Sequence, residues 1–102
     1  MAVTLHTIGM VYNFKDGLLH ALVGPDRIIH ASHQCTPEPI PTEYNYPIMN
    51  FRVGRHLQDG RHTAVLFCRE CGLRIKLEWS YKMDLKEIDT QLDAAAIRSW
   101  SE

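Results

Sequence analysis

The feature that most constrains the fold of this chain is Cys68-Arg69-Glu70-Cys71-Gly72, two cysteines at close spacing followed by a glycine. Two thiolates at this spacing can face one metal ion when the backbone between them makes a tight turn, and Gly72 suits the end of such a turn. A tetrahedral zinc ion needs two further ligands, and Cys35 is the only other cysteine of the sequence. The pattern therefore predicts a structural Zn²⁺ site that includes Cys35, Cys68 and Cys71.

A histidine close to Cys35 is the expected fourth ligand. The segment His30-Ala31-Ser32-His33-Gln34-Cys35 offers His30 and His33. We favour His33, because a short turn would aim His33 and Cys35 at one point. The alternative is that the cysteines are unligated and buried as small apolar side chains. A thioredoxin-like redox pair fits less well, because that motif opens a helix and a strand is expected here.

The spacing of apolar residues predicts an α+β fold, with one small antiparallel sheet followed by one helix. Turn signals at Asp16-Gly17, Gly24-Pro25 and Asp59-Gly60 divide the strands. The expected strands cover residues 3–14, 18–23, 27–31, 48–53, 63–67 and 73–80. Gly54 is expected at a β-bulge. We expect residues 1–102 to form a single domain stabilised by zinc.

Residues 84–100 are expected to form the C-terminal helix. Asp84 is placed as the N-cap, and Glu87 three residues later completes a helix-start pattern. An apolar stripe follows with helical spacing, which Ile97 and Trp100 do not join. Either another segment covers these two side chains, or they form an exposed apolar patch for a partner.

Residues 36–47 contain four prolines, so we expect an extended Pro-rich loop. The loop also carries Tyr44 and Tyr46. Aromatic side chains in a loop either pack on the core or form part of a contact surface.

The run Cys68-Arg69-Glu70-Cys71-Gly72-Leu73 on a predicted β-hairpin resembles the second half of a zinc ribbon. The resemblance covers Cys35 and residues 65–79. It implies a zinc cofactor, and by association it favours nucleic-acid binding. In the first half Ser32 stands where a zinc ribbon would have a cysteine.

Charge is unevenly distributed along the chain. Residues 48–82 carry seven Lys or Arg side chains against three Asp or Glu, whereas residues 83–102 are acidic. The two segments could neutralise each other within the molecule. Alternatively, the basic segment binds nucleic acid. Against this alternative, the sequence predicts no row of stacking aromatic residues on the basic face. The candidate residues for this surface are Arg52, Arg55, Arg69, Arg74 and Lys76.

The sequence contains no membrane-spanning stretch, and residues 1–10 lack the basic cluster of a signal peptide. We therefore expect a cytoplasmic location and no membrane partner. A reducing compartment also suits three cysteines that form no disulfide framework.

Three hypotheses about function follow. The first is a non-enzymatic, zinc-stabilised protein-interaction module, such as an adaptor or a phage-type inhibitor of a larger host complex. Its partner would contact Tyr44, Tyr46, Ile97 and Trp100, because aromatic anchors dominate the energetics of interfaces. The second is a nucleic-acid-binding protein that uses the basic face. The third is a zinc-dependent enzyme, which would need an open coordination position, as when no histidine binds the metal.

Overall fold

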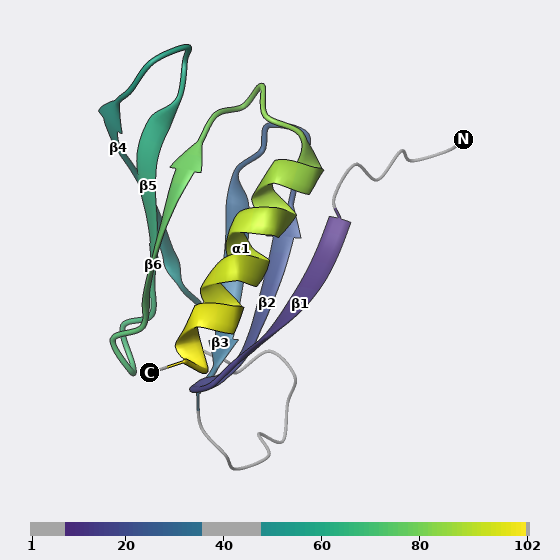
Figure 1. Ribbon diagram of the computed structural model, residues 1–102, viewed down its shortest axis with the longest axis vertical. Coiled ribbons are helices and arrows are strands. Elements are labelled where there is room, and N and C mark those ends of the chain that lie inside the picture. Colours follow the sequence, from purple (N-terminus) through teal and green to yellow (C-terminus); the bar gives the residue numbers. More distant parts are fainter. Residues whose placement is uncertain (1–7, 36–47, 102) are drawn as a thin grey trace.

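The computed structural model describes residues 8–35 and 48–101, apart from the side chain of Ile8. In these residues the chain forms six strands followed by one helix (Figure 1). Their bounds are β1 Ile8–Phe14, β2 Gly17–Val23, β3 Ile29–Gln34, β4 Asn50–His56, β5 His62–Phe67, β6 Arg74–Trp79 and α1 Leu85–Ser99. The α+β prediction is confirmed, and the strands are divided between two antiparallel sheets of three strands each.

The first sheet is a meander in which β2 lies between β1 and β3. At the turn between β1 and β2, Phe14 pairs with Gly17. Gly17 has a φ of 126°, and a Cβ at this position would lie 1.9 Å from the carbonyl oxygen of Gln34. Only glycine can therefore start β2 this close to the end of β3.

The second sheet has the order β4-β5-β6. Asp59 and Gly60 form the turn between β4 and β5, with φ values of 60° and 75°, as the Asp-Gly pair predicts. The register of β4 against β5 shifts between Val53 and His56, which confirms a bulge at Gly54. β6 alternates strictly between exposed and buried side chains.

The two sheets are joined where β3 meets the approach to β4. Ser32 and Ile48 form an isolated antiparallel bridge, and the Met49 N–H donates to the Ala31 carbonyl at 2.8 Å. Helix α1 packs against β1 of one sheet and β6 of the other (Figure 1). The buried apolar side chains of both sheets and the helix consequently form one core cluster.

The helix begins where the sequence predicts. The Asp84 side chain accepts a hydrogen bond from the Glu87 N–H at 2.9 Å, and the cap is in an extended conformation. The buried face of α1 consists of Ile88, Leu92, Ala95 and Ala96.

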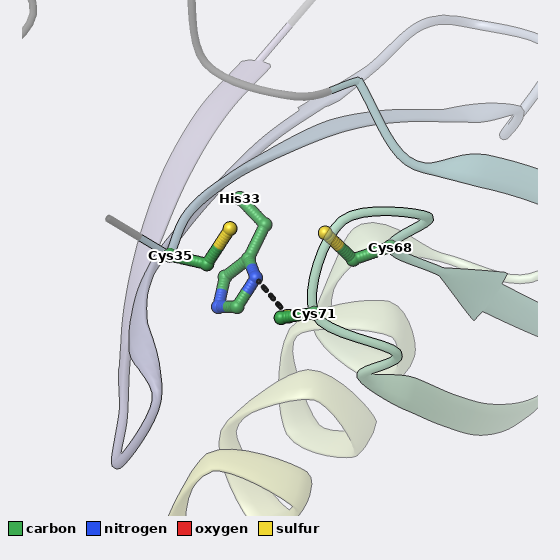
Figure 2. Close-up of side chains that lie close together, drawn as sticks. All are labelled: His33, Cys35, Cys68 and Cys71. Atoms are coloured by element: carbon green, nitrogen blue, oxygen red, sulfur yellow. Dashed lines mark hydrogen bonds between the residues drawn. The ribbon is translucent and has the colours of Figure 1, made fainter.

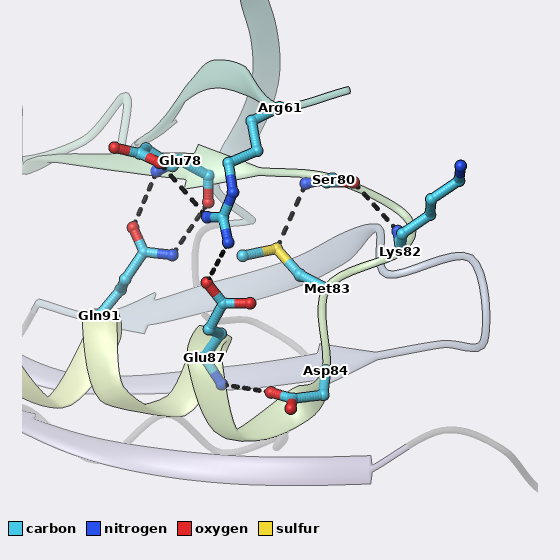
Figure 3. Close-up of polar contacts among 8 residues, drawn as sticks. All are labelled: Arg61, Glu78, Ser80, Lys82, Met83, Asp84, Glu87 and Gln91. Carbon is cyan, nitrogen blue, oxygen red and sulfur yellow. Dashed lines mark hydrogen bonds and ion pairs between the residues drawn. The ribbon is translucent and has the colours of Figure 1, made fainter. Parts of the chain in front are cut away.

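Polar contacts tie the helix to the second sheet (Figure 3). The amide of Gln91 accepts from the Glu78 N–H at 2.8 Å and donates to the Glu78 carbonyl at 2.9 Å. Arg61 pairs with both Glu78 and Glu87. The Gln91 amide thus satisfies backbone groups of β6 that are not used in pairing with β5.

The C-terminal end of the helix is exposed. Ile97 is 61% exposed and Trp100 is 55% exposed, so no described segment covers them. The Trp100 indole N–H donates to the Asn13 carbonyl at 2.8 Å, which fixes the ring beside β1. Within residues 8–35 and 48–101 the two side chains are thus exposed, and their role in binding a partner stays a prediction.

The Pro-rich loop 36–47, with Tyr44 and Tyr46, lies outside the described residues. The single-domain organisation of residues 1–102 stays a prediction. Within the described part of the chain, no helix is long and apolar enough to cross a membrane.

Replacing the helix cap tests the packing of α1. We expect Asp84→Ala to lower the free energy of unfolding by about 1 kcal/mol, because the Glu87 N–H loses its acceptor. Lys86→Ala, at an exposed position of the same helix, is the control and should change stability by less than about 0.5 kcal/mol. Urea unfolding measures both, and equal effects would contradict the role of Asp84.

Candidate metal centre

His33 reaches the centre from the end of β3. Along this strand Ile29, Ala31 and His33 are buried and His30 is exposed, because successive side chains point to opposite faces. His33 is fully buried and pairs with Leu19 of β2. Its ring therefore enters the interior beside the apolar core.

Cys35 follows β3 in a tight turn. Its N–H donates to the His33 carbonyl at 3.0 Å, so only one residue separates the donor and acceptor. The Cys35 side chain stays on the same side of the chain as the His33 ring (Figure 2). Gly17 contributes here as well, because a Cβ on this residue would lie 3.3 Å from the Cα of Cys35.

The other two cysteines lie on the knuckle between β5 and β6. The Cys68 N–H donates to the Leu73 carbonyl and the Gly72 N–H donates to the Cys68 carbonyl, both at 2.9 Å. Gly72 has a φ of 81°, and a Cβ there would meet nothing within 4 Å. The backbone conformation, and not crowding, is what favours glycine at this position.

The knuckle also directs backbone N–H groups at its sulfurs. Those of Cys71 and Glu70 act to lower the pKa of the Cys68 thiol, and that of Leu73 acts in the same direction on Cys71. Such N–H groups stabilise negative charge on sulfur. The turn is therefore suited to hold two thiolates.

The four side chains converge on one point (Figure 2). The ligand atoms of His33, Cys35, Cys68 and Cys71 all lie within 4.8 Å of one another, and this is the one such cluster among the described residues. His33 Nδ1 lies 3.2 Å from Cys71 Sγ. Ligand atoms around a tetrahedral zinc ion are about 3.5–3.8 Å apart, given Zn–S and Zn–N bonds of roughly 2.3 and 2.0 Å. Small side-chain movements would close this cluster around a metal ion.

The electrostatics of the cluster favour a cation. Burial raises the pKa of the Cys35 thiol to about 11, with further contributions from the charges of Cys68 and Cys71. Burial also raises the pKa of Cys71. At Cys68 burial acts in the same direction, but the N–H groups of Cys71 and Glu70 outweigh it and the net shift of the pKa is downward. The three thiolates repel one another, and a metal ion would remove this repulsion.

His33 is suited to act as a neutral ligand. Burial lowers its pKa, an effect that the Gly17 backbone and the Asp16 charge partly oppose. Its Nε2 is buried beside the Gly17 backbone without a hydrogen bond of good geometry. With Nδ1 directed at the cysteines, the proton would reside on Nε2, as is common for metal-bound histidine.

The structure places His33, and not His30, in the cluster, and it adds a second reason for that choice. His33 lies in the cluster, whereas His30 is exposed on the opposite face of β3. The expected short turn is present between His33 and Cys35, and the alternation of β3, which extends to Gln34, is what turns the His33 ring inward. Strand alternation, read three residues further along the sequence, would have given the same choice. Ser32 points away from the cluster side and pairs with Ile48.

The basic residues of the second sheet lie together on its outer face. Pairing places Arg52 beside Val65, and Val65 beside Lys76. In the next row Phe67 lies between Asn50 and Arg74. Arg69 is on the knuckle, and Arg55 is in the bulge, where its N–H donates to the Thr63 hydroxyl at 2.9 Å.

Phe67 is the residue that the sequence reasoning missed. Its alternation with the buried Leu66 indicates an outward side chain, yet Phe67 was not among the residues that we assigned to the basic face. In the structure the Arg74 guanidinium lies 5.9 Å from the centroid of the Phe67 ring. The basic face therefore carries the Phe67 ring, which by itself is not a row of stacking aromatic residues.

Comparisons with protein-family models, with curated proteins and with solved structures found no match. The resemblance to a zinc ribbon therefore depends on the residues of the knuckle alone. What the structure adds is a His/Cys cluster that could bind a metal ion.

Gly17 provides a test of how the first sheet positions Cys35. We expect Gly17→Ala to cost roughly 3 kcal/mol of stability or more, because its Cβ would overlap the Gln34 carbonyl, and to reduce metal binding by moving Cys35. Gly60→Ala is the matched control, since Gly60 also has a positive φ but its Cβ would meet nothing within 4 Å. It should cost about 1–2 kcal/mol and leave metal binding intact. Urea unfolding and elemental analysis measure these effects, and equal losses in both variants would contradict this account.

Proposed function

We propose that the chain is a non-enzymatic binding module whose fold is held by one structural zinc ion. The observation that carries this proposal is the convergence of one histidine and three cysteines on one point. Nitrogen and sulfur donors in this combination are typical of structural zinc sites. Four protein ligands fill a tetrahedron and leave no position for water, so a zinc-dependent enzyme has the least support.

The position of the cluster supports a structural role. His33 and Cys35 come from the first sheet, whereas Cys68 and Cys71 come from the second. Between the sheets the described backbone pairing is the bridge of Ser32 with Ile48 and the adjoining hydrogen bond of Met49. A zinc site can contribute on the order of 10 kcal/mol to folding, which is comparable to the entire stability of a small domain. The metal would therefore hold the two sheets together.

A protein partner is the binding function that the helix end supports. Ile97 and Trp100 lie one turn apart on α1, and each is more than half exposed. Trp100 is already oriented by the Asn13 carbonyl, so little side-chain entropy would be lost when a partner covers it. An aromatic and an aliphatic anchor at this spacing suit an apolar groove on a larger protein. Tyr44 and Tyr46 remain predicted contributors, and an adaptor or inhibitor role belongs to this proposal.

Nucleic-acid binding is the second candidate function. The observation that favours it is the outer face of the second sheet, where Arg74 flanks Phe67 while Arg52 and Lys76 flank Val65 in the adjacent row. Basic side chains beside an aromatic ring are the usual components of a surface for single strands.

The zinc site is tested by variants at the two histidines of β3. We expect one zinc ion per chain in the wild type and in His30→Ala, and its loss in His33→Ala, because only His33 faces the cysteines. His33→Cys should retain zinc, because four thiolates also bind this metal. Elemental analysis of the purified proteins measures each case.

Stability provides the second measurement for the same site. Cys71→Ser changes an exposed side chain by one atom, so its effect on packing is small. We expect it to lose zinc and roughly 5 kcal/mol or more of stability. A wild-type protein that contains no metal, or a Cys71→Ser variant as stable as the wild type, would contradict a structural zinc ion.

The helix-end surface is tested by Ile97→Ser. This variant should fold and bind zinc normally, since Ile97 is 61% exposed and lies outside the core. We expect it to lose the proteins that the wild-type chain captures from a cell extract, because truncation of an interface anchor costs about 2 kcal/mol or more. Lys82→Ser, an exposed residue near the other end of α1, should capture the same proteins as the wild type. Equal capture by Ile97→Ser would exclude this surface.

A further inference from the structure

We propose that the outer face of the β4-β5-β6 sheet is a binding site for single-stranded nucleic acid, with phosphates on Arg52, Arg74 and Lys76 and a base stacked at Phe67. This inference rests on the second candidate function. It adds that the ligand is single-stranded and that the side chains of the site lie in two adjacent rows. It also assigns Phe67 to contact a base, whereas the basic side chains contact phosphates.

Strand pairing places these side chains in two adjacent rows. One row runs Arg52–Val65–Lys76 across the three strands, and the next runs Asn50–Phe67–Arg74. Neighbouring strands are about 4.8 Å apart, and residues two positions apart along a strand are about 7 Å apart. Cations therefore lie on both sides of the central strand, with Val65 and Phe67 between them. A strand of nucleic acid lying across this face could place its backbone on the cations and a base on the central ring.

The cations of this face are not neutralised within the described part of the chain. In residues 8–35 and 48–101 the ion pairs are those of Arg61 with Glu78 and Glu87. No carboxylate of that part is therefore within ion-pair distance of Arg52, Arg74 or Lys76. The basic segment does pair with the acidic C-terminal helix, but through Arg61 and Glu87, and the helix packs against the buried side chains of β6. The positive charge of the outer face is available to an external anion.

Phe67 distinguishes this face from a general polyanion site. The ring is half-buried in the sheet, and the Arg74 guanidinium lies 5.9 Å from its centroid. A cavity of about 720 Å³ opens at this point, lined by Phe67, Arg52, Arg69 and Arg74 among others. A second cavity of about 370 Å³ shares Arg52 and Arg74 in its lining and adds Lys76. The larger one has room for a planar base beside the ring and the guanidinium, where stacking and cation–π attraction can both act.

This arrangement favours a single strand over a duplex. Bases in a duplex stack on one another and cannot reach a ring on a sheet surface, whereas bases of a single strand can. An acidic protein surface would satisfy the cations, but it would leave the ring and its cavity without a complementary group. The single strand accounts for both features.

The zinc centre holds one edge of this site. Phe67 and Cys68 are consecutive and point to opposite faces of the sheet, so the thiol faces the metal cluster while the ring faces outward. Arg69 lies between the two knuckle cysteines and lines the larger cavity. Metal binding would fix the knuckle and with it the position of Phe67 and Arg69.

Fluorescence anisotropy with a labelled twelve-nucleotide thymidine strand tests the proposal on the zinc-loaded protein. We expect measurable binding at 50 mM salt, with a slope of log K against log salt of about −2 to −3 for three or four phosphate contacts. Arg52→Glu and Lys76→Glu should each weaken binding by roughly tenfold and make the slope shallower by about 1. Lys82→Glu, an exposed reversal away from this face, should bind as the wild type does.

Phe67→Leu separates stacking from charge. We expect about fivefold weaker binding or more, with an unchanged salt slope, because the cations remain while the aromatic ring is lost. The zinc content of each variant is measured alongside, so a disrupted metal site is recognised separately from a lost binding face. Variants that keep the wild-type zinc content and lose nucleic-acid affinity as expected would support the proposal. This result would not bear on the separate proposal of a protein partner at the helix end.

Four results would overturn the proposal. Wild-type affinity in Arg52→Glu and Lys76→Glu, or no binding at 50 mM salt, would exclude the face as a nucleic-acid site. Equal or tighter binding of a twelve-base-pair duplex, with Phe67→Leu unchanged, would exclude a single strand. Competition by a twelve-residue glutamate peptide as strong as that of the unlabelled thymidine strand would assign the face to acidic proteins instead.

Discussion

The feature on which this account of the structure depends is the meeting of four side chains from two sheets that could ligate one metal ion. Without a cation this arrangement is unfavourable, because burial and, to a smaller extent, the charges of Cys68 and Cys71 raise the pKa of Cys35, and a buried imidazole lies beside the three cysteines. Backbone N–H groups of the knuckle favour thiolate at Cys68, which is the opposite of what an apolar site for unligated cysteines requires. A metal ion would resolve the conflict by balancing the thiolates. The two sheets would then share a fixed junction at the edge of the core.

Much of the fold followed from local patterns in the sequence. The alternation of β6, the Asp59-Gly60 turn and the Asp84 cap are short-range features whose physical basis lies within a few residues. The division of the strands into two sheets is different, because it depends on where β3 stops pairing and on the packing of α1 against β1 and β6. Those contacts join residues far apart in the sequence, and no local pattern specifies them.

The candidate site was predicted in its membership and only partly in its geometry. The cysteine spacing indicated Cys68 and Cys71, and the third cysteine with its nearby histidines indicated the rest. The end of β3 was placed too early, which hid the strand alternation that selects His33 over His30. The role of Phe67 also depends on pairing between strands. Phe67 lies beside Arg74 only when β5 and β6 are in register, and no local pattern around Phe67 specifies that register.

X-ray absorption spectroscopy at the zinc edge tests the central claim most directly, because it reports the ligands of the bound metal. A coordination shell of three sulfurs at about 2.3 Å and one nitrogen at about 2.0 Å is the result that this account predicts for the purified protein. A shell of nitrogen and oxygen atoms without sulfur would contradict the cluster of His33 and the three cysteines. A protein that purifies without zinc and does not take it up would contradict it equally.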